Sequence, residues 1–277
     1  MGYVKRVHHD LLVDKSSFQD LYITLKNKYA KPLIQNWVES TDPQKHVFED
    51  IAIAAFLILL WSENKGEETR FVDIGCGNGT LVYLLTMEGH EGYGFDARKR
   101  KSWTTFPSQV QERLLEKVLI PHFIQSDSPV EDGIHNGIFK DGEFLISNHA
   151  DQLTPWTPLL AALTPNSGFL AIPCCEQDFS GCKVSGGLLK LSPLKEGNRG
   201  RYTSYCEWIS QISKAMGWSV EKEMLRIPST RNTGIAGRKI DFVKDKEKAL
   251  EIIKEFGGDN GYRGFIERAL KLKASAS

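Results

Sequence analysis

Three glycines at alternating positions follow an apolar run in this chain of 277 residues. The run covers residues 71–74, contains the acid Asp73, and leads directly into Gly75, Gly77 and Gly79. The next apolar run ends in a second acid, Asp96. Glycines permit a tight strand-to-helix turn whose backbone comes close to a ligand, and a carboxylate one strand later can hold ribose hydroxyls. The pattern therefore predicts a nucleotide-binding site.

The spacing of this motif discriminates between nucleotide cofactors. A dinucleotide fingerprint requires G-x-G-x-x-G, but the third residue after Gly77 is Thr80. Asp73, just before the first glycine, suits a ligand that carries an ammonium group better than one that carries a pyrophosphate. Both departures predict S-adenosylmethionine (AdoMet) as the cofactor, with S-adenosylhomocysteine as its product.

Later strand ends extend the predicted cofactor site. Asp96 should take the ribose hydroxyls, Asp127 the adenine amino group, and Asn148 should lie beside the sulfonium. The carboxyl ends of parallel strands share one edge of a sheet, so these side chains should lie together. The predicted cofactor-binding residues are Asp73, Gly75, Gly77, Asn78, Gly79, Asp96, Ala97, Ser126, Asp127 and Asn148.

The residues that follow the fourth predicted strand indicate which chemical group accepts the methyl group. Enzymes that methylate base amines often carry Asp/Asn-Pro-Pro-aromatic after this strand. This chain has Asn148-His149-Ala150-Asp151 instead, which disfavours an amine as the methyl acceptor. A ribose hydroxyl needs its proton removed, and His149 and Asp151 are the predicted catalytic residues. Asp151 could instead cap a helix, and His149 could be a structural hydrogen-bond donor.

Two adjacent cysteines, Cys174 and Cys175, follow the fifth predicted strand. A thiolate there could add to pyrimidine C6 and activate C5 for methylation, which requires a lowered thiol pKa. Cysteine is also a common core residue, and packing is the alternative explanation. The cysteines include no C-x-x-C pair, so the sequence predicts no metal site.

Basic and aromatic residues cluster after several strands, and such clusters can neutralise phosphates while an aromatic ring stacks on an unpaired base. The net charge is zero, so an RNA surface would have to arise from local charge asymmetry. A solvated surface is the alternative for each cluster. The predicted RNA-binding residues are Arg98, Arg100, Arg199, Arg201, Tyr202, Arg226 and Arg231.

Strands that alternate with helices should position these residues. We expect N-terminal helices at 16–29 and 43–61, a helix containing Val110, Leu114 and Val118, a helix at 202–216, and two tail helices separated by 257–258. Expected strands lie at 70–75, 92–96, 122–126, 143–147 and 168–173, with a final pair around 228–233. This order predicts an α/β, Rossmann-like fold with a mostly parallel sheet and helices on both faces. We divide the chain into an N-terminal helical extension (1–62), a cofactor-binding domain (63–243) and a helical tail (244–277).

Composition narrows the class of protein. Hydrophobic residues make up 41% and charged residues 25%, as in ordinary globular proteins. The longest apolar run, 51–61, is shorter than the roughly 20 residues that a membrane span needs. Five cysteines, an odd number, favour a reducing compartment. With no basic-then-apolar leader visible, we see no secretory signal and expect no membrane association. No obligate protein partner can be read from the sequence.

Taken together, the motifs resemble the tRNA (uracil-2′-O)-methyltransferase family, a group of class I AdoMet-dependent enzymes. The resemblance covers roughly residues 5–240. Its matching segments are VHHDLL at 7–12, TDP at 41–43 with Lys45 and FED at 48–50, DIGCGNG at 73–79, NHADQLTPW at 148–156, IPCC at 172–175 and RIPST at 226–230. The resemblance implies a cytoplasmic enzyme that methylates the ribose of uridine 44 in eukaryotic serine tRNA. It does not identify the general base.

Three hypotheses follow from the sequence. The first is a tRNA ribose 2′-O-methyltransferase, and the second is a C5-pyrimidine RNA methyltransferase that uses Cys174 or Cys175. The third is a non-catalytic AdoMet-fold scaffold, which the intact glycine motif disfavours.

Overall fold

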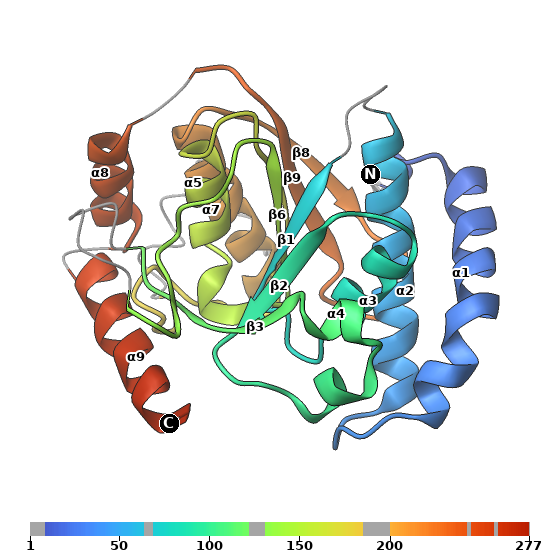
Figure 1. Ribbon diagram of the computed structural model, residues 1–277. Coiled ribbons are helices and arrows are strands. Elements are labelled where there is room, and N and C mark those ends of the chain that lie inside the picture. The colour runs from blue at the N-terminus through green and yellow to red at the C-terminus, as the bar shows by residue number, and fades with distance from the viewer. Residues whose placement is uncertain are drawn as a thin grey trace.

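A seven-stranded sheet forms the centre of the fold (Figure 1), in the order β3-β2-β1-β6-β7-β9-β8. The computed structural model describes residues 9–63, 69–121, 131–184, 200–242, 245–257 and 260–276. The five strands from β3 to β7 are parallel, and β9 runs antiparallel to both β7 and β8. The strands are β1 (Arg70–Ile74), β2 (Gly92–Asp96), β3 (Leu114–Glu116), β6 (Glu143–Asn148), β7 (Gly168–Ile172), β8 (Trp218–Met224) and β9 (Thr233–Ile240). This is the mostly parallel sheet that the sequence predicts.

Helices cover both faces of the sheet (Figure 1). One face is covered by α1 (Lys15–Gln35), α2 (Pro43–Ser62) and α3 (Thr80–Met87). The other is covered by α5 (Trp156–Ala162) and α7 (Arg201–Ala215), with α8 (Lys246–Gly257) and α9 (Gly261–Ala276) packed further out. The remaining short elements are η1 (Lys101–Thr105), α4 (Ser108–Gln111), β4 (Val118–Leu119), β5 (Ile134–His135) and η3 (Asp151–Leu153).

Alternation along β1 joins the two layers. Phe71 packs into the core beneath α2, whereas Val72 and Ile74 point into the core beneath α5 and α7. Successive strand side chains point to opposite faces, so Asp73 lies on the α2 side of the sheet. A carboxylate is thereby buried at the carboxyl end of the central strand.

The α2 helix begins with a strong N-terminal signal. The Asp42 carboxylate accepts hydrogen bonds from the backbone amides of Gln44 and Lys45, and Pro43 occupies the first helical position. From Ile51 to Leu57 every residue is buried. The helix therefore packs against the sheet.

The structure corrects the third βα unit. The predicted helix through Val110, Leu114 and Val118 is wrong: α4 ends at Gln111, and Leu114–Glu116 forms strand β3 on the open edge of β2. Apolar residues four apart fit either element, and pairing with β2 decides in favour of the strand. The predicted strand at 122–126 lies outside the described residues.

Among the described residues, none of the helices combines the length and the apolar character needed to cross a bilayer.

Candidate functional site

The glycine turn after β1 adopts the backbone conformation that its sequence predicts. Gly75, Gly77 and Gly79 have φ angles of +73°, +51° and +76°. A Cβ on Gly79 would lie 2.9 Å from the Leu114 side chain, so that glycine is required for close packing. A Cβ on Gly77 would meet nothing within 4 Å. Gly77 therefore faces the open space where a ligand can approach the backbone.

Asp96, at the end of β2, lies against this turn. Its Oδ2 accepts a hydrogen bond from the Gly77 amide at 3.0 Å, and its Oδ1 accepts one from the Arg98 amide at 3.1 Å. The Arg100 guanidinium lies 3.7 Å from Oδ1. The carboxylate that the sequence assigns to ribose recognition is thus next to the glycine turn, as expected.

The segment after β2 holds the turn in place. The indole N–H of Trp103 donates to the Gly77 carbonyl at 2.9 Å, and the Ser102 hydroxyl donates to the Asn78 carbonyl at 2.7 Å. The Asn78 side-chain oxygen accepts from the Thr80 amide at 2.7 Å. The side chain of Asn78, a residue predicted to bind the cofactor, therefore stabilises the start of α3.

Asp73 is a buried carboxyl at the end of β1. Its side chain is 2% exposed, and its Oδ1 has no hydrogen-bond partner among the described residues. Burial and repulsion from Asp96 raise the pKa of Asp73 to about 8. An unpaired buried carboxyl is costly, and a cationic ligand group would relieve that cost. This orphaned atom fits the ammonium group of AdoMet.

The sequence interpretation did not assign two further acids at this edge, Glu49 and Asp50 of α2. Both are buried, and they contact the two residues at the end of β6: Asn148 Nδ2 donates to Asp50 at 3.2 Å, and His149 Nε2 donates to Glu49 at 2.8 Å. Burial, with repulsion from Glu49 and Asp73, raises the pKa of Asp50. The signal in the sequence is a pair of acids at the start of a strongly apolar helix segment.

These raised pKa values predict a pH-dependent stability. Between the ordinary value near 3.8 and the folded value of about 8, folded Asp73 binds a proton that the unfolded chain does not. The free energy of unfolding of the ligand-free protein should therefore fall as the pH rises through this range. Denaturant unfolding at several pH values measures the slope, which Asp73→Asn should reduce. An identical slope in Asp73→Asn would contradict the buried, protonated carboxyl.

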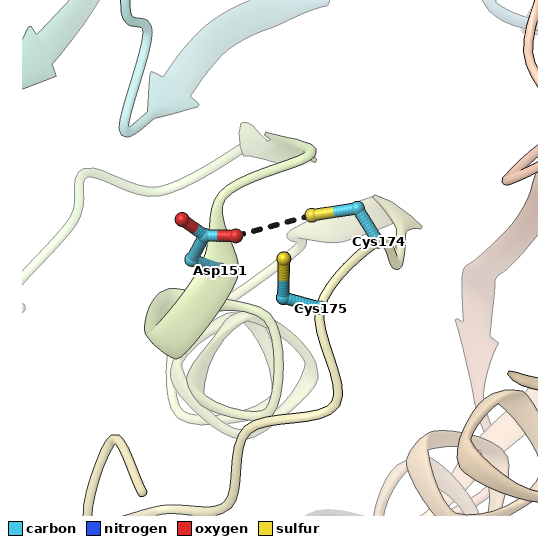
Figure 2. A group of neighbouring side chains, drawn as sticks. All are labelled: Asp151, Cys174 and Cys175. Carbon is cyan, nitrogen blue, oxygen red and sulfur yellow. Dashed lines mark hydrogen bonds between the residues drawn. The ribbon is translucent and has the colours of Figure 1, made fainter. Parts of the chain in front are cut away.

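The predicted catalytic residues lie just after β6, both with left-handed backbone. His149 has φ +51° and Asp151 has φ +45°. The His149 ring is hydrogen-bonded to Glu49 through Nε2. Its Nδ1 is buried without a hydrogen-bond partner among the described residues. Asp151 is exposed, and Cys174 Sγ donates to its Oδ1 at 3.2 Å, as Figure 2 shows. The two residues therefore have different environments, one held against α2 and one open at the sheet edge.

Cys174 and Cys175 are next to Asp151 rather than in the core, which corrects the packing alternative for both (Figure 2). Burial and the Asp151 carboxylate raise the pKa of Cys174. The hydrogen bond to Asp151, together with partial burial, raises the pKa of Cys175. Both shifts oppose thiolate formation, which C5 chemistry requires.

The predicted RNA-binding residues do not form a single group. Arg201 and Arg231 both pair with Glu176, at 3.1 and 3.6 Å, and Arg231 stacks 4.4 Å above the Tyr202 ring. Arg226 instead forms a two-pronged ion pair with Asp10.

The predicted cofactor residue Ala97 is half-buried and packs beside β4 and β5. Arg199, Ser126 and Asp127 lie outside the described residues.

The strand order and the glycine turn define a Rossmann-like class I methyltransferase fold. A family model described as "Predicted AdoMet-dependent methyltransferase" matches residues 12–121. The chain is 48% identical to a tRNA (uracil-O(2)-)-methyltransferase of Schizosaccharomyces pombe, covering 100% of this chain and 58% of that protein. The protein of the same name from Saccharomyces cerevisiae is 42% identical over 98% of this chain and 55% of its own length. The chain is therefore similar to part of these tRNA methyltransferases over its own full length, and to the AdoMet-dependent methyltransferase family model over residues 12–121.

The chain spans a little over half the length of these relatives. Among solved structures, magnesium protoporphyrin IX methyltransferase from Synechocystis with bound SAH aligns with a TM-score of 0.40 and 15% identity, over 79% of this chain and 96% of that one. That likeness is too distant to add to the argument.

Proposed function

We propose that this chain is an AdoMet-dependent methyltransferase that transfers a methyl group to a uridine ribose 2′-hydroxyl of tRNA, with serine tRNA as its substrate. The observation that carries the proposal is the buried Asp73 carboxyl, whose Oδ1 has no hydrogen-bond partner in the described part of the chain, beside a glycine turn that is open at Gly77. The names of the relatives supply the acceptor, a uracil nucleotide of tRNA. We also propose a cytoplasmic location, which the family resemblance implies.

The pocket would hold AdoMet by its two ends. Asp96 accepts the ribose hydroxyls, and the backbone at Gly75 and Gly77 comes close to the cofactor. Asp73, on losing its proton, would balance the ammonium charge. When bound, AdoMet supplies an electrophilic methyl group from its sulfonium. Asp127 remains a predicted adenine contact, Ser126 a predicted cofactor contact, and Asn148 a predicted contact at the sulfonium.

The acceptor hydroxyl would approach at the end of β6. Asp151 is the exposed carboxylate there, and we propose that it accepts a hydrogen bond from the ribose hydroxyl and orients it toward the methyl group. His149 is held by Glu49, so we assign it a positioning role for the segment 148–151. The neighbouring thiols have raised pKa values, which disfavours the C5 alternative. The glycine turn, with Asp73 and Asp96 beside it, disfavours a scaffold.

A substrate analogue tests the proposal directly. Serine tRNA should accept labelled methyl groups from AdoMet, whereas the same tRNA with 2′-deoxyuridine at position 44 should accept none, because the acceptor oxygen is missing. A non-serine tRNA tests the substrate class. Equal labelling of the deoxy tRNA would contradict ribose methylation, and equal labelling of the non-serine tRNA would contradict serine specificity.

Arg98 and Arg100 follow β2 at the cofactor edge, and we propose that they contact tRNA phosphates. The double change Arg98→Ala, Arg100→Ala should weaken tRNA binding and lower the slope of log affinity against log salt by about 2, roughly 1 per lost phosphate contact. Fluorescence titrations over a salt series measure this. Arg263 lies on α9 with its side chain 83% exposed. The variant Arg263→Ala is the matched control and should leave the slope unchanged. Equal slopes in both variants would refute the assignment.

A further inference from the structure

We propose that Asp151, Cys174 and Cys175 form a binding site for a zinc-like divalent ion at the carboxyl edge of β6 and β7. One carboxylate oxygen and two sulfur atoms, one from each residue, all lie within 4.8 Å of one another (Figure 2). The site shares Asp151 with the proposed acceptor position, but the proposed methyl transfer does not require an ion there.

The donor set and its spacing fit zinc. Zinc prefers thiolate sulfur, imidazole nitrogen and carboxylate oxygen in a tetrahedral arrangement. Bond lengths of about 2.3 Å to sulfur and 2.0–2.2 Å to oxygen place tetrahedral ligand atoms roughly 3.5 Å apart. Cys174 Sγ and Asp151 Oδ1 are 3.2 Å apart. Small side-chain rotations would therefore bring the three atoms around one ion.

The charge of Asp151 also points to a cation. Among the described residues, no lysine, arginine or histidine nitrogen lies within 4.0 Å of its carboxylate. The carboxylate instead accepts a hydrogen bond from Cys174 and interacts with the Cys175 side chain. A negative group directed at two sulfur atoms has the composition of a metal site rather than of a salt bridge.

The backbone holds the ligands in place. The His149 amide donates to the Ile172 carbonyl at 3.1 Å, which ties the end of β6 to the end of β7. Asp151 begins η3, and the Gln177 amide donates to the Cys175 carbonyl at 3.0 Å. Ligands on strand ends that are tied together lose little freedom when an ion binds. The sequence prediction of no metal considered cysteine spacing alone and could not place a carboxylate from the neighbouring strand beside the thiols.

Three protein ligands would leave the fourth position of a tetrahedral ion open. Asp151 and Cys175 are exposed, so this position faces solvent. An oxygen from water or from the RNA backbone could occupy it. The second Asp151 oxygen would remain available to the ribose hydroxyl.

Cobalt(II) spectroscopy on the reduced protein tests the site. We expect one equivalent of Co²⁺ to give thiolate-to-metal charge-transfer bands and the visible bands of a tetrahedral ion, both displaced by Zn²⁺. Zinc uptake should release about two protons, one from each thiol. In Cys174→Ser, Cys175→Ser the charge-transfer bands should disappear, and zinc affinity measured against a chelating indicator should fall by more than about 100-fold.

Two further variants make the result decisive. Asp151→Asn should weaken zinc binding while keeping the sulfur bands. Cys182→Ser changes a half-buried cysteine outside the cluster and should bind zinc like the wild type. Calorimetry with AdoMet reports whether each variant retains its cofactor pocket. Zinc binding that is undetectable in the wild type, or equal in the double-serine variant and the wild type, would overturn the site without affecting the proposed methyltransferase function.

Discussion

Replacing Gly77 by arginine is expected to abolish AdoMet binding. Gly77 has φ +51°, and its Cβ position opens into unoccupied space, so a long side chain would extend into the region where the cofactor must lie. The new guanidinium would also lie beside Asp96, which accepts the Gly77 amide hydrogen and is predicted to bind ribose. Calorimetry should show an affinity loss of more than about 100-fold, which corresponds to about 2.7 kcal/mol.

Gly142→Arg is a matched control for backbone strain. Gly142 has φ +76° and likewise has nothing within 4 Å of its Cβ position, but it precedes β6 at the opposite edge of the sheet. This variant should bear a similar cost for a left-handed residue and still bind AdoMet normally. Unchanged affinity in Gly77→Arg, or equal losses in both variants, would remove the cofactor from the glycine turn.

Changing His149 to alanine is expected to lower kcat by about 100-fold, with a much smaller effect on AdoMet affinity. The hydrogen bond from His149 to Glu49 holds a left-handed residue between Asn148 and Asp151, and losing it should displace the acceptor hydroxyl from its productive position. A displacement of about 1 Å can cost 10²-fold in rate. Single-turnover methyl transfer and AdoMet calorimetry separate the two effects.

Glu49→Gln distinguishes positioning from general destabilisation. Its amide oxygen can still accept the His149 hydrogen bond, so most of kcat should be retained, whereas Glu49→Ala should resemble His149→Ala. Losing either partner leaves a buried polar group unpaired, at about 1–3 kcal/mol of stability, so the assay temperature should lie well below each variant's unfolding transition. A fully active His149→Ala enzyme would contradict the positioning role.

The sequence was most informative where one residue type has one physical use. Alternating glycines before a helix and an acid at the next strand end left few alternatives, and the structure places Asp96 against Gly77 as predicted. The predicted helix start at residue 43 likewise agrees with the first residue of α2. The prediction from local sequence was wrong at 110–118. The spacing of apolar residues there fits a helix, but pairing with β2 makes 114–116 a strand.

Contacts between distant segments could not be predicted from local patterns. Glu49 lies 100 positions from His149, and only the packing of α2 on the sheet brings them together. The same holds for Asp151 and the two cysteines, which belong to different strand ends. The division into segments at 62/63 and 243/244 remains a prediction.

Mass spectrometry of nucleosides from serine tRNA, after incubation with the protein and labelled AdoMet, tests the central claim most directly. We predict that the label appears on 2′-O-methyluridine, with the methyl group retained on the ribose fragment. Label on the base, or no label in a protein shown to bind AdoMet, would contradict the proposed function.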